Sequence, residues 1–197
     1  MRAERTALRP VSPPVRFGLI GCGDIGVKDA EAIIACPGAE LVACHDVLGR
    51  LARDVAARFG ARAEAHLETM LAGHDVDAVL IATPHDTHEP IALLTLDAGQ
   101  HVLLEMPLAH SLASAQRMAA AADATPLKLS VLFPMRTDAR FTRARDAIKA
   151  GLVGAPLGVS ASHLVDKPRS YFYGGFSQRA QSSWRLSKAR SGGGFSS

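Results

Sequence analysis

Residues 15–26 read Val-Arg-Phe-Gly-Leu-Ile-Gly-Cys-Gly-Asp-Ile-Gly, a short apolar run followed by glycines in the pattern G-x-G-x-x-G. An apolar run of this length that leads directly into glycines predicts a buried strand of a parallel sheet. The residues that follow, from about 25 to 35, predict a helix that ends before Pro37 and Gly38. The order of strand, glycine turn and helix is the context that a phosphate-binding turn requires.

Each glycine of this turn has a separate predicted role. Gly21 allows the tight turn, Gly23 lets backbone N–H groups approach a pyrophosphate, and Gly26 lets the helix pack closely on the strand. The helix N-terminus adds unpaired N–H groups and the positive end of the helix dipole. We therefore expect a dinucleotide cofactor to bind across the turn. The residues predicted to contact or shape its pyrophosphate are Gly21, Cys22, Gly23, Asp24, Ile25 and Gly26.

Asp46 follows the next predicted strand and lies about 20 residues beyond Gly26, the position of the ribose-binding carboxylate in such units. We expect it to accept hydrogen bonds from the adenosine ribose, and its charge would repel a 2′-phosphate. This favours NAD as the cofactor. Arg50 lies four residues further on and keeps NADP open as the alternative. Two other interpretations are a plain glycine-rich turn with a surface aspartate and a nucleoside-binding methyltransferase.

The remaining chain continues the alternation of strands and helices. Strands are predicted over residues 40–45, 78–81, 101–104 and 127–132, and helices over residues 48–59, 89–98, 112–124 and 139–150. Such alternation predicts an α/β fold, a Rossmann-type doubly wound parallel sheet. A further strand is predicted over residues 156–165, followed by a segment rich in Gly, Ser and Arg. We expect a flexible tail over 1–14, an NAD(P)-binding domain over 15–135, and the start of a truncated α+β substrate domain over 136–197.

Composition excludes several classes of protein. The 22 basic and 19 acidic residues form no basic stripe, so we expect no nucleic-acid partner. The three cysteines show no CxxC spacing and the histidines no metal-ligand spacing, so we expect no metal. The first 14 residues lack the apolar segment of a signal peptide, and no apolar run reaches 18 residues. These features predict a cytoplasmic protein without a membrane partner.

From Phe17 onward the sequence resembles the glucose–fructose oxidoreductase/inositol dehydrogenase (Gfo/Idh/MocA) family. Besides the glycine turn, the resemblance rests on His45-Asp46 and on the segments at 82–88, 98–107, 148–154, 184–185 and 192–194. It implies an NAD(P)-dependent oxidoreductase that acts on CH–OH groups, with hydride transfer to or from a sugar, polyol or related hydroxyl or carbonyl substrate. The further cofactor-binding residues it implies are Thr83, Pro84, His88, Glu105, Pro107, Trp184 and Arg185. For His88, a purely local hydrogen-bonding role is the alternative.

The sequence departs from the family pattern at the Glu-Lys-Pro motif, which reads Glu105-Met106-Pro107 here. A lysine ammonium donates hydrogen bonds and takes part in proton transfer, whereas a thioether only accepts weakly. Met106 therefore predicts weakened or altered catalysis, with a neutral filling of the pocket as the alternative, and leaves Glu105 as the catalytic candidate. His85 stands where the family usually has Asn.

The chain ends before the segment in which relatives carry their catalytic histidine, and neither His163 nor Lys167 has a spacing that replaces it. We therefore expect a fragment, and an unfinished sheet predicts pairing with a second copy as a homo-oligomer. One alternative to an active oxidoreductase is a non-catalytic or fragmentary dinucleotide-binding protein. Another is a chain that binds nothing because its incomplete second domain prevents stable folding.

Overall fold

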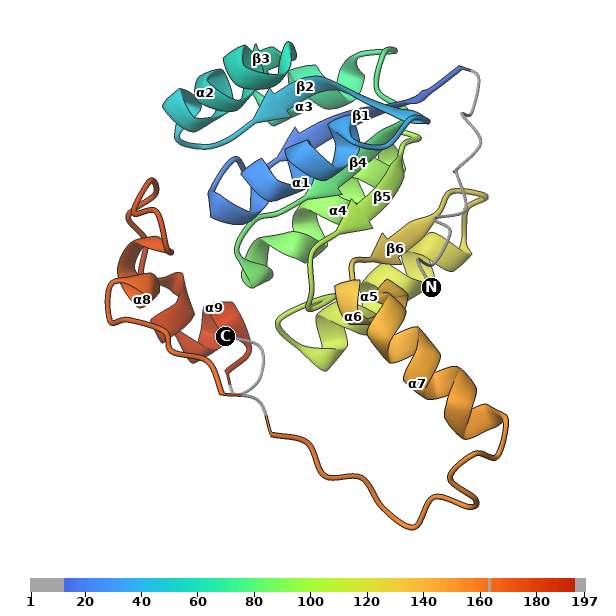
Figure 1. Ribbon diagram of the computed structural model, residues 1–197. Helices are drawn as coiled ribbons and strands as arrows, with labels where there is room; N and C mark the ends of the chain where they lie inside the picture. The colour runs from blue at the N-terminus through green and yellow to red at the C-terminus, as the bar shows by residue number, and fades with distance from the viewer. Residues whose placement is uncertain (1–12, 163, 194–197) are drawn as a thin grey trace.

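Six parallel strands form one sheet in the computed structural model, which describes residues 13–162 and 164–193 (Figure 1). Their spatial order is β3-β2-β1-β4-β5-β6, so the chain reverses its direction of winding between β1 and β4. The strands within the described residues are β1 (Val15–Ile20), β2 (Ala39–His45), β3 (Arg62–Glu64), β4 (Ala78–Ile81), β5 (His101–Leu104) and β6 (Leu129–Val131). This arrangement confirms the predicted Rossmann-type α/β fold.

Helices connect the strands and cover both faces of the sheet (Figure 1). The longer ones are α1 (Asp24–Ile34), α2 (Gly49–Phe59), α4 (His88–Asp97), α5 (Leu112–Asp123) and α7 (Ala139–Lys149). The shorter helices and 3₁₀ turns are α3 (Leu67–Ala72), η1 (His85–Thr87), α6 (Pro134–Thr137), α8 (Tyr171–Gly174), η2 (Trp184–Leu186) and α9 (Lys188–Ser191). The structure therefore places every predicted helix within about two residues of its expected bounds.

The core consists of two apolar layers, one on each face of the sheet. Successive side chains of a strand point to opposite faces, so Leu19 and Leu80 pack against α1 and α2, whereas Ile20 and Ile81 pack against α3, α4 and α5. Because both layers are needed to bury the strands, the sheet is fixed in position and its carboxyl ends form a rigid platform for a site.

Two parts of the predicted fold are corrected by the structure. No element is predicted from the sequence between residues 61 and 77, where β3 and α3 form. Conversely, residues 156–165 were predicted as a strand, but residues 155–162 and 164–166 are exposed and belong to no strand. Val159 is 92% exposed. No described strand lies beside this segment, and an isolated strand has no partner for its backbone hydrogen bonds.

The chain from 170 to 193, called the C-terminal arm below, returns to the sheet after this exposed segment (Figure 1). It lies against α1, α2 and η1 at the carboxyl ends of the strands, where Asp24, Asp54 and Asp86 receive hydrogen bonds from it. The predicted division at residue 135 stays a prediction. Three features named in the sequence analysis lie outside the described residues: positions 1–12 of the predicted tail, His163 and Gly194.

Candidate functional site

The glycine turn joins β1 to α1 at the point where the sheet reverses its winding. Gly21 has φ +93°, and a Cβ added there would lie 2.5 Å from the Ala82 carbonyl oxygen. A Cβ on Gly26 would lie 1.9 Å from the Gly21 oxygen. Gly23, in contrast, faces open space, with nothing within 4 Å of an added Cβ. Two of the glycines are thus required by backbone packing, and the third leaves the helix N-terminus open to a ligand.

Asp46 is tied directly to this turn. Its Oδ2 accepts a hydrogen bond of 2.7 Å from the Cys22 N–H, and its Oδ1 accepts one of 2.8 Å from the Leu48 N–H. Each carboxylate oxygen has a second lone pair, so the carboxylate keeps acceptor capacity for ribose hydroxyls. The Cys22 N–H is already engaged with Asp46, and the contact of the Cys22 thiol with Cys44, together with burial, raises the pKa of that thiol. Cys22 therefore packs as a neutral group and fixes Asp46 beside the turn.

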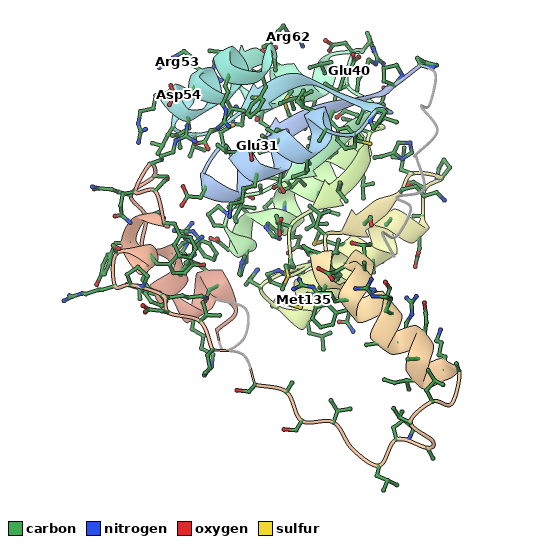
Figure 2. The ribbon with its side chains drawn as sticks, in the orientation of Figure 1. Glu31, Glu40, Arg53, Asp54, Arg62 and Met135 are labelled. Atoms are coloured by element: carbon green, nitrogen blue, oxygen red, sulfur yellow. The ribbon has the colours of Figure 1, made fainter. Side chains whose placement is uncertain are left out.

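The C-terminal arm covers the outer side of the turn. Asp24 accepts hydrogen bonds from the Ser177 hydroxyl and from the Ser177 N–H, the latter at 3.0 Å. Burial alone would raise the pKa of Asp24, but these hydrogen bonds lower it overall. Arg50 donates to the Arg179 carbonyl oxygen, and Arg179 forms an ion pair of 3.3 Å with Asp54. Asp54 lies on α2, where Figure 2 labels it. The structure thus directs Asp24 and Arg50 toward the arm, and Ile25 is exposed beside them.

Thr83 and Pro84 follow β4 and lie next to the turn, as the predicted site requires. The Thr87 hydroxyl, at the end of η1, lies 2.8 Å from the Thr83 hydroxyl and holds the loop in place. His88 is fully buried, and its ring nitrogens each lie 3.0 Å from a carbonyl oxygen, one of Thr83 and one of Pro107. Burial lowers the pKa of His88, while the two carbonyl contacts oppose that shift. This placement favours the local role, in which His88 joins the two loops.

Glu105 directly follows β5, and its N–H donates to the Ile81 oxygen at 2.9 Å. Its Oε2 accepts a hydrogen bond of 3.1 Å from the Met106 N–H. Met106 is 47% exposed, and the peptide bond between Met106 and Pro107 is cis. The three residues of the motif therefore lie at the same sheet edge as the glycine turn, with the Met106 side chain at the surface.

Asp29 is the site residue that the sequence analysis missed. It lies on α1 and is only 8% exposed, and its Oδ2 has no hydrogen-bond partner among the described residues. Burial raises the pKa of Asp29 to about 7, assisted by the negative charge of Glu105. Burial also raises the pKa of Glu105. A sequence signal for Asp29 exists, because it shares the buried face of α1 with Ala30 and Ile33.

Trp184 and Arg185 reach the site from the arm. The Trp184 side chain is 9% exposed, and its ring lies 4.5 Å from the His85 ring, centroid to centroid, in an edge-on contact. Arg185 lies over the Trp184 ring at 4.4 Å. His85 is further fixed by the Ser191 carbonyl oxygen, 2.9 Å from its Nδ1, and burial lowers the pKa of His85. The arm therefore closes over η1.

Every predicted cofactor-binding residue thus lies at or beside the carboxyl ends of β1, β2, β4 and β5, or in the arm that covers them. This is the edge where open parallel sheets bind ligands. Within the described ranges, no group of three or more His, Cys, Asp or Glu residues is arranged to hold a metal ion. The same ranges contain no helix that is both long and apolar enough to span a bilayer.

Comparison with known proteins identifies similar chains. The family model described as "oxidoreductase family, NAD-binding Rossmann fold" (Gfo/Idh/MocA) matches residues 15–133. A 1,5-anhydro-D-fructose reductase from Ensifer adhaerens is 31% identical over 91% of this chain and 51% of its own. An inositol 2-dehydrogenase/D-chiro-inositol 3-dehydrogenase from Shouchella clausii is 36% identical over 80% of this chain and 47% of its own. The chain therefore spans about half the length of the curated relatives it matches.

Among solved structures, the WlbA dehydrogenase from Bordetella pertussis, in complex with NADH and UDP-GlcNAcA, superimposes with a TM-score of 0.68. It is 34% identical, and the match covers 72% of this chain and 41% of that one. The family-model match at residues 15–133 spans the six strands of the sheet and the helices between them.

Proposed function

The chain belongs to the Gfo/Idh/MocA oxidoreductase family, and from that premise we propose that it binds NAD(H) at residues 21–26 and serves hydride transfer to or from a sugar or polyol. One observation carries the proposal: the open approach at Gly23 stands beside an Asp46 carboxylate held by the Cys22 N–H. A pyrophosphate fits the open approach at Gly23, and a ribose diol fits the Asp46 carboxylate.

Different residues of the chain are proposed to bind different parts of the dinucleotide. The N-terminus of α1 offers backbone N–H groups to the pyrophosphate, and Asp46 accepts from the adenosine ribose. Thr83, Pro84 and Glu105 follow β4 and β5 at the same sheet edge, and we assign them to the nicotinamide end. Trp184 and Arg185 cover this edge from the arm. When bound, the nicotinamide supplies the hydride acceptor or donor, and the protein supplies orientation and proton handling.

The preference for NAD over NADP follows from charge. A 2′-phosphate at the adenosine ribose would face the Asp46 carboxylate, and the cation that could compensate, Arg50, is engaged with the Arg179 carbonyl oxygen. The proposal extends to substrate class because the relatives named above are reductases and dehydrogenases of anhydrofructose and inositol.

The test uses the protein's one tryptophan. Trp184 lies at the site, so NADH is expected to quench its emission and to show energy transfer to the nicotinamide. The same titration with NADPH should give a weaker effect. Because a ligand that binds the folded state raises its stability, NADH should also raise the unfolding temperature. Failure of NADH and NADPH at about 1 mM to produce either signal would contradict the proposal.

The second candidate function is dinucleotide binding without catalysis, and Met106 is the observation that favours it. Met106→Lys provides the discriminating variant, assayed by NADH absorbance over a panel of sugars and inositols. Substantial turnover by the natural sequence excludes this candidate, and a large gain in turnover in Met106→Lys also counts against it. Binding of NADH with no turnover in either protein supports it.

A further inference from the structure

The C-terminal arm, residues 170–193, is hydrogen-bonded to the sheet edge at three aspartates that lie on three different elements. Asp24 is the first residue of α1, Asp54 lies on α2, and Asp86 lies in η1. These elements follow β1, β2 and β4, so they stand on both sides of the point where the sheet reverses its winding. The arm therefore spans the place where open parallel sheets admit a ligand.

Two of these contacts have the geometry of good hydrogen bonds. Asp24 accepts one of 3.0 Å from the Ser177 N–H and a second from the Ser177 hydroxyl. Asp86 Oδ2 accepts one of 2.8 Å from the Arg190 guanidinium. The contact at Asp54 is longer, 3.3 Å. We call the Asp24–Ser177 and Asp86–Arg190 contacts the latch of the arm.

The charge of the arm is complementary to the edge on which it lies. The arm contains no acidic residue, and its basic residues are Arg179, Arg185, Lys188 and Arg190. The edge presents three carboxylates to it. Opposite charges of this kind favour the docked position of the arm. A change of charge at the latch should therefore shift the arm between a docked and an undocked state.

Apart from the latch, the arm buries little apolar surface. Within the described residues 170–193, Trp184 is the one apolar side chain that belongs to the buried core, and its ring lies 4.5 Å from the His85 ring. Phe176 is 61% exposed. The connection before the arm is exposed at residues 155–162 and 164–166. A segment with so few buried apolar contacts can open locally while the sheet stays folded.

We propose that the arm is a lid over the glycine turn, and that opening of its latch admits and releases the dinucleotide. The inference rests on the proposed function, which assigns this ligand to residues 21–26. With the arm docked, nothing lies within 4 Å of a Cβ added to Gly23, so the closed lid leaves the turn itself free for a pyrophosphate. The next residue, Asp24, is held by the arm. The latch therefore controls the exchange of the ligand.

The latch is tested first without a ligand, through the emission of Trp184, the one tryptophan of the chain. Ser177→Asp sets a second carboxylate against Asp24, and Asp86→Ala removes the other acceptor of the latch. Both variants should shift the Trp184 emission to the red and raise its quenching by acrylamide, with an unchanged far-ultraviolet circular dichroism spectrum. Gln181→Glu is the matched control, because it adds a charge at an exposed position of the arm outside the latch. It should retain the natural emission and quenching.

The lid function is then tested by stopped-flow binding of NADH, followed through the emission of NADH itself. If the lid must open before the ligand enters, the observed rate in the natural sequence levels off at high NADH concentration. Loss of one latch contact should raise that plateau and the NADH dissociation rate by about fivefold or more. Ser177→Asp adds a negative charge and Asp86→Ala removes one, so faster exchange in both cannot arise from repulsion or attraction of the ligand. Gln181→Glu should retain the natural rates.

The two measurements separate the possible failures. If Trp184 stays as protected in both latch variants as in the natural sequence, the latch does not hold the arm, and the inference is overturned whatever the NADH result. Latch variants that uncover Trp184 but exchange NADH at the natural rates overturn the lid function alone. If the latch variants uncover Trp184 and the natural sequence binds neither NADH nor NADPH, the proposed function and the lid function are both overturned, and the latch stands.

Discussion

Gly26→Ala isolates the packing requirement of the glycine turn. The added Cβ would lie 1.9 Å from the Gly21 carbonyl oxygen and 2.9 Å from its carbonyl carbon. Because both atoms are backbone, α1 must move away from β1 by roughly 1.5 Å to reach an ordinary contact. Overpacking of this kind costs about 3 kcal/mol, and alanine recovers about 1 kcal/mol of helix propensity. We therefore expect the free energy of unfolding to fall by about 2 kcal/mol or more.

Urea denaturation followed by circular dichroism measures this loss, with an unchanged m-value as the check on two-state behaviour. Gly23→Ala is the matched control, because its Cβ meets nothing within 4 Å and its φ of −71° suits alanine. It should cost only about 0.5–1 kcal/mol as a poorer helix cap. It should nevertheless weaken NADH binding, since the new methyl group enters the approach to the pyrophosphate. A Gly26→Ala protein within about 0.5 kcal/mol of the natural sequence would refute the packing argument.

Three further predictions concern the site. Between the unfolded aspartate pKa of about 3.9 and the folded Asp29 pKa of about 7, the folded state binds more protons, so stability should fall as pH rises through this window. Asp29→Asn should flatten that dependence, and its free energy of unfolding at pH 8, measured by urea denaturation, should exceed that of the natural sequence by on the order of 2–4 kcal/mol. If the free energies of unfolding of the two proteins ran parallel with pH, the raised pKa of Asp29 would be contradicted. His88→Leu should cost about 1–3 kcal/mol by removing the ring N–H that donates to the Thr83 or the Pro107 carbonyl oxygen, and an unchanged urea midpoint would argue against this role. Asp46→Ser should narrow the preference for NADH over NADPH by about tenfold in fluorescence titrations, and an unchanged ratio would show that Asp46 does not select the cofactor.

Local patterns explain why most of the fold could be predicted from the sequence. The strands at β1, β4 and β5 are apolar runs between turn residues, and their bounds follow from that contrast. β3 was missed because it is three residues long and largely exposed, so it lacks an apolar period. The segment 156–165 has strand-forming residues, but a strand also requires a neighbour. Propensity alone therefore gave the wrong answer there.

The site divides in the same way. The turn and Asp46 were predictable because a fixed spacing connects them. Asp29 lies on α1 and Glu105 follows β5, and the effect of Glu105 on the pKa of Asp29 depends on the order of strands in the sheet, which no spacing rule predicts. The contact between Ser177 and Asp24 spans 153 positions and follows no spacing rule. Prediction thus succeeded for the interaction within one βαβ unit and failed for interactions between segments that only the tertiary fold brings together.

The exposed connection before the C-terminal arm has a consequence for how the arm stays docked. Its polar contacts, such as Arg179–Asp54 and Arg190–Asp86, are surface ion pairs worth at most about 1 kcal/mol each. A connection of about 20 residues holds the arm near the sheet at an effective concentration in the millimolar range, so weak contacts suffice. Cleavage within this connection would turn docking into a bimolecular equilibrium. At micromolar protein the severed arm would then dissociate and uncover the edge where Asp46 and Glu105 lie.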